Sequence, residues 1–506
     1  MTRFSGLFGC VFVALALAGA AQGGLAVGIT EDAGKSTDGG ASFFATMADV
    51  GLTVNRVSIT WDSTQPDTIP GQTEIESWLP QAQTAGVRIM FAVAPAHTRD
   101  LTSSPAAPGQ FADFLQRIAR TFPQVKDFVI GNEPNQPYFW LPQFDTAGRP
   151  VSAAAYEPVL AKAYDALKAV DPTINVIGVG LSPRGNDNPN APNNVSRSPV
   201  RFLHDLGAAY RASGRTKPLM DELAYHPYPS SSKDALSTGY VWPNAGVANL
   251  DRIKQAVWDA FHGTAQPTFA ETGVRTYAKP LLFELDEVGW QVAIPAALSS
   301  FYFGTENTPV TDETTQAQIY SDLITTLECD PSVRSLNLFH LMDERDLGRW
   351  QSGLVRADGS HRPSYDRVKE TIAQTHGTCQ GQETAWVHNA HVVLPFAAWG
   401  SRRSYPVRRR QWSFLAGAGE EAAFRAAIFK AGTKKSVIAR RLATGRPRPL
   451  ATAVGTIKAT GRVVYFPSRR LKAGRYVYAI RLAATMNPQR VSVLIGPALR
   501  VGGLRR

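Results

Sequence analysis

Between residues 25 and 376, short apolar runs rich in β-branched residues alternate with longer stretches whose apolar residues recur at helical spacing. This alternation is typical of βα repeats, in which each strand is followed by a helix that covers the sheet. Eight such strand runs predict a closed (β/α)8 TIM barrel with long loops. A doubly wound open sheet is the rival architecture, but no glycine-rich phosphate-binding motif follows the first run.

The expected strands share short length, β-branched composition and flanking turn residues. They cover residues 24–29, 53–60, 88–94, 127–130, 175–179, 221–225, 281–286 and 335–339. The helices expected between them include 109–121, 153–170, 200–213, 247–261 and 315–327.

The chain has 506 residues, of which 44% are hydrophobic and 19% charged, so it is long and apolar enough for a barrel plus a smaller domain. Its net charge of +11 is unevenly distributed. Residues 381–506 hold 24 Lys and Arg but only 3 Asp and Glu, whereas the rest of the chain is acidic. We therefore expect a signal peptide at 1–23, a barrel domain at 24–378, a linker at 379–387 and a basic β-sandwich domain at 388–506.

The N-terminus has the features of an export signal. Arg3 precedes an apolar run from Leu7 to Ala18, and small residues follow at Gly19 and Ala20. The run is shorter than the roughly 20 residues that a membrane-spanning helix needs. We expect a secreted, extracellular protein with no transmembrane segment in the mature chain.

Cysteine usage agrees with export. Cys10 lies in the expected signal, which leaves Cys329 and Cys379 near the ends of two successive barrel helices. These two side chains can form one disulfide in an oxidising compartment, and a pair of buried thiols is the alternative.

Polar residues able to do chemistry follow the ends of the expected strands, where TIM barrels carry their active sites. The motifs are Asn132-Glu133-Pro134 after the fourth strand, His226-Pro227-Tyr228 after the sixth and Glu287-Val288-Gly289-Trp290 after the seventh. Together they resemble the clan A glycoside hydrolases, in particular the cellulase-like family 5 and the neighbouring family 39. The resemblance covers residues 25–376 and includes Asp358-Gly359-Ser360 and Arg362-Pro363-Ser364-Tyr365.

The resemblance implies a retaining mechanism with Glu133 as acid/base and Glu287 as nucleophile. Retaining glycosidases hold these two carboxyl groups about 5–5.5 Å apart. Glu133 must be protonated when the sugar binds, so we expect its pKa to be raised. Arg56 resembles the second-strand arginine that keeps the nucleophile ionised, and Asn132 would bind the sugar 2-OH. His226 and Tyr228 resemble the groups that orient the nucleophile.

Glu287 has competitors for the role of nucleophile. Strand alternation puts Leu281, Phe283, Leu285 and Glu287 on one face, which we interpret as an apolar row facing the barrel and ending in a carboxylate. Glu284 and Asp286 fall on the opposite face. Glu271 is the reserve, although it follows Gln266-Pro267, a pair typical of a loop.

Aromatic residues in the loops are candidates for stacking on sugar rings. Trp140 and Trp290 are the two we include among the substrate-binding residues, and Tyr138-Phe139-Trp140 is the expected subsite wall. Trp61 and Trp350 are further candidates. His340 is included as a binding residue, with a structural role at the barrel rim as the alternative, and His97 resembles a third-strand histidine of family 5.

No cofactor and no metal site are expected. The segment 186–194 is rich in Asn, Pro and Asp, but with Asp187 as its one acid it is a poor calcium loop. No His or Cys spacing matches a zinc site.

The basic C-terminal region alternates apolar runs with turn residues, and the expected strands are 437–439, 453–459, 462–466, 476–482 and 491–494. The step Leu471-Lys472-Ala473-Gly474-Arg475-Tyr476 resembles those of Ig-like or fibronectin-like sandwiches. No nucleic-acid-binding motif is visible. An anionic cell-wall or polysaccharide surface is the expected partner, and a merely solvated Arg-rich surface is the alternative.

Three functions therefore stay open at this point. The first is retaining hydrolysis of a β-linked glycan, with carbohydrate as substrate. The second is non-catalytic polysaccharide binding on a barrel that has lost activity. The third is transglycosylation at the same site.

Overall fold

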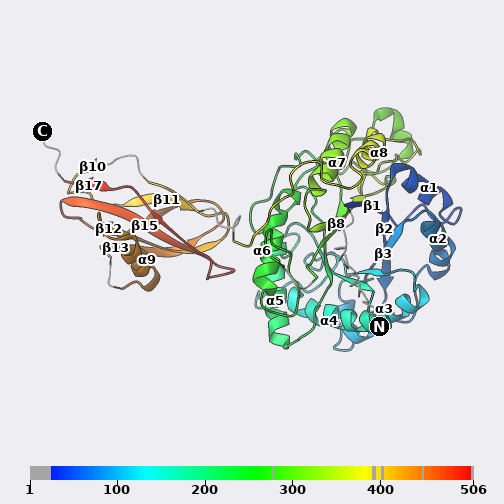
Figure 1. Cartoon of the computed structure of the whole chain (residues 1–506), viewed down its shortest axis with the longest axis horizontal. Helices are drawn as coiled ribbons and strands as arrows, with labels where there is room; N and C mark the ends of the chain where they lie inside the picture. The colour runs from blue at the N-terminus through cyan, green and yellow to red at the C-terminus, as the bar shows by residue number, and fades with distance from the viewer. Residues whose placement is uncertain (1–23, 276–278, 390–394, 400–403, 447–448, 503–506) are drawn as a thin grey trace, which may run out of the picture.

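The computed structural model describes residues 24–275, 279–389, 395–399, 404–446 and 449–502. Its first part is a closed barrel of eight parallel strands in chain order, with helices around the outside (Figure 1). The strands are β1 (Ala26–Thr30), β2 (Val54–Trp61), β3 (Arg88–Pro95), β4 (Asp127–Ile130), β5 (Asn175–Leu181), β6 (Glu222–Tyr225), β7 (Phe283–Val288) and β8 (Val333–Phe339). The TIM barrel prediction is confirmed, and each expected strand range overlaps one of these strands.

The helices bury an apolar stripe against the barrel. In α3, Phe111, Leu115 and Ile118 recur at helical spacing and are buried. Asp312 caps α7 by accepting a hydrogen bond of 2.8 Å from the backbone N–H of Thr315. The helices are α1 (Ala41–Val50), α2 (Gln72–Thr84), α3 (Ala107–Thr121), α4 (Ser152–Val170), α5 (Pro199–Ser213), α6 (Leu250–Phe261), α7 (Glu313–Leu327) and α8 (Pro363–Thr375). Short 3-10 turns are η1 (Asp100–Thr102), η2 (Val247–Asn249) and η3 (Ala296–Phe301).

The barrel interior is layered. A middle layer is apolar and consists of Val54, Met90, Ala92, Val129, Ile177 and Ala224. A charged layer lies at the N-terminal ends of the strands, where Arg88 Nη1 is 3.2 Å from both Asp127 and Glu284. A second charged layer, with Arg56 and His226, lies toward the C-terminal ends of the strands, the end at which TIM barrels place their chemistry.

The second part of the chain forms a lobe beside the barrel (Figure 1), with two sheets that share one core. The six-stranded sheet consists of β10 (Ser404–Tyr405), β12 (Ala422–Lys430), β13 (Ala451–Ile457), β15 (Gly474–Ala484), β16 (Val491–Ile495) and β17 (Leu499–Val501). The three-stranded sheet consists of β9 (Phe396–Ala398), β11 (Ser413–Gly417) and β14 (Arg462–Tyr465). Phe414 from the smaller sheet and Ile480 from the larger one lie in the same core, as in a β-sandwich.

One expected strand of this lobe is wrong, and five strands were not predicted. Residues 437–439 lie in helix α9 (Lys435–Thr444), so the domain is not all β. Ile438 and Leu442, four residues apart, are buried against the outer face of the six-stranded sheet, and Gly445 ends the helix at φ 71°. The unpredicted strands are β9, β10, β11, β12 and β17.

The predicted linker, 379–387, packs on the barrel. Trp386 is buried in the barrel–helix core, and its backbone carbonyl accepts a hydrogen bond from Thr272 N. Cys329 and Cys379 form a disulfide with a Cα–Cα distance of 4.6 Å, just beyond the ends of α7 and α8. The expected signal peptide, 1–23, lies outside the described residues. Within the described residues, no helix combines the length and apolar character needed to cross a membrane.

Candidate active site

The backbone after β4 is shaped to present Glu133 above the barrel. Glu133 has φ 37°, a left-handed conformation that costs free energy for a residue with a side chain. Its N–H donates to the carbonyl of Gly180 (2.9 Å), which the irregular end of β5 exposes between Val179 and Leu181. Strain at a functional position requires such support from its surroundings, and β5 supplies it.

His226 lies at the centre of the site, where its ring contacts three carboxyl groups. Its Nδ1 lies 3.0 Å from Glu133 Oε1 and 3.5 Å from Glu287 Oε2. On the other side of the ring, Nε2 lies 3.3 Å from Asp286 Oδ1. The imidazole is fully buried, whereas the Glu133 and Glu287 side chains keep 15% and 12% exposure, so both carboxyl groups face the open end of the barrel.

Arg56 and Tyr228 complete the surroundings of Glu287. Arg56 Nη1 lies 3.0 Å from Glu287 Oε1, and the Tyr228 hydroxyl donates to Glu287 Oε2 at 3.2 Å. Arg56 Nη2 also donates to Asn132 Oδ1 at 2.7 Å. The Asn132 amide nitrogen makes no hydrogen bond within the described residues, so this donor is available to a ligand.

Burial and charge divide the protons among these groups. Burial raises the pKa of Glu133, and the nearby Glu287 carboxylate raises it further, against the opposing effect of His226. Burial lowers the pKa of His226, but Glu287, Asp286 and Glu133 outweigh burial and raise this pKa to about 10. Two cations, Arg56 and His226, thus balance two carboxylates, and Glu133 is the carboxyl group that can keep a proton without leaving unbalanced charge.

Glu287 reaches the site for a different reason from the one its sequence context suggested. Phe283 and Leu285 pack in the layer between barrel and helices, so the expected barrel-facing row is wrong. Glu284 and Asp286 instead point into the barrel, where they contact Arg88 and Arg56 respectively. The pairing of β7 with β8 shifts between Leu285 and Val288, and this bulge turns Glu287 to the same side as Asp286.

The reserve nucleophile, Glu271, is not in the site. It precedes β7 and its Oε1 lies 2.6 Å from Nδ1 of His388. That contact belongs to the segment that follows the barrel, at the opposite end of β7 from Glu287.

The predicted sugar-stacking tryptophans are buried, so this part of the prediction is wrong. Trp140 and Trp290 are 2% and 1% exposed and pack edge-on against Tyr156 and Tyr320. Trp61 is likewise buried. A side chain without an exposed face cannot stack on a sugar ring.

Two other aromatic residues are placed to meet a ligand. Trp350 is half-buried and packs against Tyr228, with ring centroids 4.9 Å apart, so it lies one residue away from Glu287. Tyr138, in the loop that follows Glu133, is 82% exposed. Sequence reasoning named both residues, but it gave precedence to their buried neighbours.

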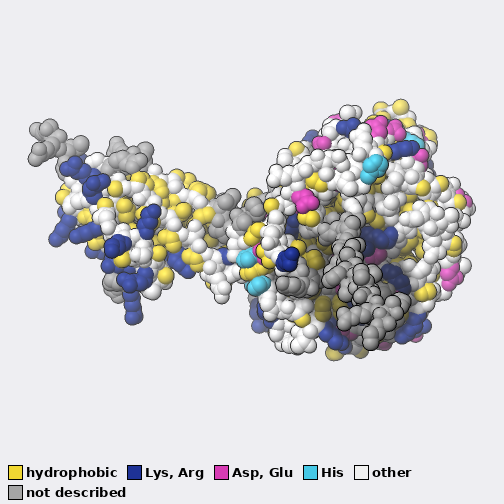
Figure 2. Space-filling view, in the orientation of Figure 1, with side chains coloured by type: hydrophobic (Ala, Val, Ile, Leu, Met, Phe, Trp, Pro, Cys, Tyr) yellow, Lys and Arg dark blue, Asp and Glu magenta, His cyan; other side chains and the backbone are white. Residues whose placement is uncertain are grey.

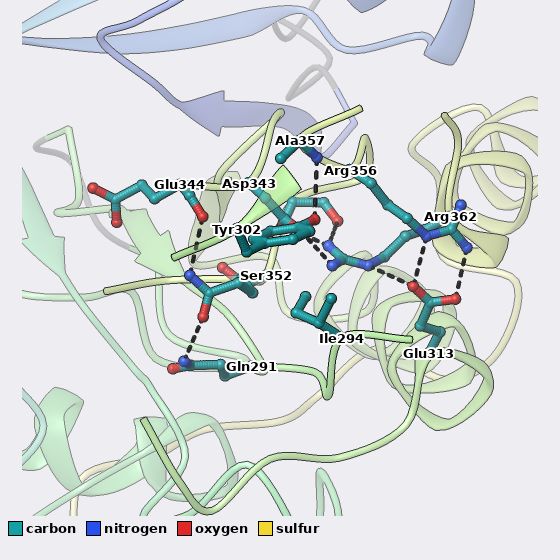
Figure 3. Close-up of polar contacts among 12 residues, drawn as sticks. Gln291, Ile294, Tyr302, Glu313, Asp343, Glu344, Ser352, Arg356, Ala357 and Arg362 are labelled. Carbon is teal, nitrogen blue, oxygen red and sulfur yellow. Dashed lines mark hydrogen bonds and ion pairs between the residues drawn. The ribbon is translucent and has the colours of Figure 1, made fainter. Parts of the chain in front are cut away.

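The loop that carries Trp350 is held by a buried ionic network (Figure 3). Arg362 pairs with Asp343 at the end of β8 and with Glu313 of α7. Glu313 also pairs with Arg356 at 2.6 Å, and the Tyr302 hydroxyl donates to Asp343 at 2.7 Å. Sequence reasoning missed this support, although Arg362 lies in the motif stretch that it singled out.

His340 lies on the same face of the barrel but makes no hydrogen bond or ion pair with Glu133 or Glu287 among the described residues. Its Nδ1 is 3.1 Å from the Thr30 carbonyl and 3.5 Å from Glu31. Burial lowers the pKa of His340, but Glu31 and Glu344 raise it to about 10. These contacts favour a structural role for His340 at the rim of the barrel.

Two groups of ligand-type residues lie close together in the described parts of the chain: Asp62, His97 and Asp100, and Asp127, Glu222 and Glu284. Arg88 and Arg334 neutralise the second group, and His97 pairs with Asp100 at 3.2 Å in the first. Asp187, the acid of the 186–194 loop, pairs with Arg197 at 3.0 Å. We assign no metal to any of them.

The chain matches no protein-family model, and a search of curated proteins finds no match. Solved structures similar to it include a family 39 glycoside hydrolase from Bacteroides cellulosilyticus WH2, with 14% identity over 88% of this chain and 81% of that one and a TM-score of 0.48. A glucosidase from Croceicoccus marinus has 14% identity over 89% and 96% of the two chains and a TM-score of 0.46. A monomeric β-xylosidase from Caulobacter crescentus CB15 has 15% identity over 91% and 96% and a TM-score of 0.42. At such identities, function must be inferred from the site itself.

Proposed function

We propose that the protein is a retaining glycoside hydrolase that cleaves a β-linked glycan or glycoside. The observation that carries this proposal is the shared contact of Glu133 and Glu287 with one nitrogen, His226 Nδ1, at 3.0 and 3.5 Å. Carboxyl groups held this close fit the spacing of about 5–5.5 Å in retaining enzymes better than the roughly 6.5–9.5 Å that leaves room for a water molecule in inverting ones.

In the first step, Glu287 attacks the anomeric carbon while Glu133 gives its proton to the departing oxygen. Arg56 and Tyr228 hold Glu287 by its two oxygens, so the carboxylate is oriented before the sugar arrives. In the second step, Glu133 takes a proton from water, and the water oxygen displaces Glu287 from the sugar. After the second step, Glu133 is again protonated and Glu287 is again a free carboxylate.

The Asn132 amide would donate to the 2-OH of the sugar, because Arg56 already occupies its carbonyl oxygen. This interaction strengthens as the anomeric carbon becomes positively charged. The β configuration of the substrate rests on the motif resemblance. We also propose that the protein is exported, which sequencing the N-terminus of the mature protein would test.

The decisive experiment treats the mature protein with a panel of aryl β-glycosides and β-glycans and follows the first-formed anomer by NMR. Retention is expected, and a 2-fluoro glycoside of a cleaved substrate should label the peptide that contains Glu287. A label on Glu271 would show that the assignment of Glu287 as nucleophile is wrong. If glycans bind but none is cleaved, the protein is a binding protein on a glycosidase-like barrel.

A further inference from the structure

The acidic side chains Glu420 and Glu421 of the lobe lie where it meets the barrel. Arg490 of the lobe lies between Glu420 (2.7 Å) and Asp259 of α6 (2.8 Å), and Glu421 pairs with Arg201 of α5 at 2.9 Å. Within described residues 404–502, Arg490 is the one basic side chain in an ion pair. The other lysines and arginines therefore lack an acidic partner in the described chain, and Figure 2 shows them over the outer part of the lobe.

Two pairs of these arginines oppose each other directly in the six-stranded sheet. Arg425 of β12 is the register partner of Arg481 of β15, and Arg475 of β15 is the partner of Arg500 of β17. Directly opposed residues have Cα atoms about 4.5–5.5 Å apart, and like charges at that distance destabilise a sheet. Two such pairs in one sheet require a reason.

Both pairs lie on the same face, the one that α9 covers. Arg475 and Arg481 alternate along β15 with Tyr476, Tyr478 and Ile480, which point into the core between the sheets. Val477 and Ala479, which share the face of the arginines, pack against α9 instead. The two pairs are separated by six residues of one strand, or about 20 Å.

Helix α9 covers the sheet between the two pairs and adds a further charge at its C-terminal end, near the first pair. A side chain at Gly445, where α9 ends, would collide with Nη1 of Arg425, so this arginine lies against the helix terminus. Arg441 is in the last turn of the helix, and its Nε is buried without a hydrogen-bond partner in the described chain. The partial negative charge of the helix end offsets part of the repulsion. Five arginines then lie around α9: Arg425, Arg441 and Arg481 near its C-terminal end, and Arg475 and Arg500 beyond the sheet residues that the helix covers.

We propose that these five arginines (Arg425, Arg441, Arg475, Arg481 and Arg500, the basic strip) bind a polyanionic glycan. Guanidinium groups bind carboxylates and related oxyanions in forked pairs. The two arginine pairs are about 20 Å apart, so a linear polymer that passes over α9 would reach both with several sugar units. Single-stranded nucleic acid is bound by stacking on aromatic side chains. The strip offers none beside the Arg425–Arg481 pair, because the other strand neighbours of these two residues are Val454 and Val493.

The test measures binding of the full mature chain to polygalacturonate, with fully methyl-esterified polygalacturonate as the uncharged probe of the same backbone. Four glutamine substitutions, R425Q, R475Q, R481Q and R500Q, remove the sheet arginines of the strip. A control, R408Q, R410Q, R469Q and R470Q, removes the same charge from loops outside the sheet. Thermal unfolding of both variants checks the fold, and the strip variant should unfold no earlier than the wild type, because its like-charge pairs are gone.

Polygalacturonate should bind and be released by salt, the esterified polymer should not bind, and the strip variant should bind about tenfold more weakly than the control variant. Equally weakened binding in both variants would mean that the polymer is held by diffuse charge attraction, and it would overturn the strip as the binding site. The glycan would be overturned as the ligand if polygalacturonate does not bind at low salt. The same holds if duplex DNA or phosphatidylglycerol vesicles bind more tightly in a way that depends on the strip. Binding is measured independently of turnover, so this proposal and the proposed hydrolysis fail separately.

Discussion

Asp286 lies behind His226, with its Oδ1 3.3 Å from Nε2, on the side of the imidazole opposite Glu133 and Glu287. Burial raises the pKa of Asp286, but His226 and Arg56 outweigh burial and lower this pKa below its ordinary value. Asp286 therefore keeps its charge and stabilises the imidazolium that faces Glu133 and Glu287. In the proposed reaction it would act through His226, as a positioning residue.

Replacing Asp286 with Asn should lower kcat by about 10²-fold with little change in KM. The imidazolium loses one of its anionic partners, so the pKa of His226 should fall from about 10. Histidine NMR titration of the wild type and the variant measures this shift directly. A lower kcat with an unchanged His226 pKa would mean that Asp286 has only a packing role.

Glu133→Gln should lower kcat by about 10²–10⁴-fold for substrates with poor leaving groups and much less for activated aryl glycosides. An activated leaving group departs without a proton, so only the second step still needs the acid/base residue. Azide should restore turnover of the activated substrate by attacking the glycosyl-enzyme. Glu287→Gln is the matched variant, and it should lose turnover of both substrate types without azide rescue.

In the proposed mechanism the protonated form of Glu133 is the proton donor, so activity should fall as the pH rises through the raised pKa of Glu133, at a higher pH than an ordinary glutamate would give. The measurement is the pH dependence of kcat/KM with a substrate whose leaving group needs protonation. In Glu133→Gln, assayed with an activated substrate, this alkaline limb should disappear. An alkaline limb that survives the substitution would have to be assigned to another group.

Trp350→Ala and Trp290→Ala should affect different properties, substrate binding in the first case and stability in the second. Trp350 is half-buried beside Tyr228, so its loss should raise KM several-fold at nearly unchanged stability. Trp290 is buried and its indole N–H donates to the Asp234 carbonyl, so its loss should cost about 3–5 kcal/mol of unfolding free energy. Urea unfolding and steady-state kinetics on both variants separate the two roles.

Removing the disulfide with Cys329→Ser and Cys379→Ser together should lower the unfolding free energy by about 2–4 kcal/mol. The bond closes a loop with a sequence separation of 50, which restricts the unfolded chain. The bridge lies at the ends of α7 and α8, away from Glu133 and Glu287, so kcat and KM at 25 °C should not change. A loss of activity in the folded double variant would contradict this separation.

The barrel was predictable because its strands combine β-branched residues with turn residues at each end, and its helices carry an apolar stripe. The position of Glu133 was predictable for the same reason, since it directly follows the strand run 127–130. The role of Asp286 was not, because local alternation cannot reveal the bulge between Leu285 and Val288 that brings two adjacent carboxylates to one side.

Contacts with distant segments determine the secondary structure of the lobe. Strand β12 is rich in alanine, which favours helices, yet it lies between β13 and β15 and its backbone pairs with both. Helix α9 contains Val437 and Ile438, which favour strands, but Ile438 and Leu442 find their apolar contact at a spacing of four. Neither outcome is encoded within the segment itself.

The layers inside the barrel have a kinetic consequence. Val54, Met90 and their apolar neighbours fill the middle of the barrel, and the salt-bridged layer of Arg88 and Glu284 closes the end below. In the proposed reaction, substrate and product would then enter and leave at the same end of the barrel. A cleaved sugar that stays there would exclude the next substrate molecule, so the released product should inhibit competitively.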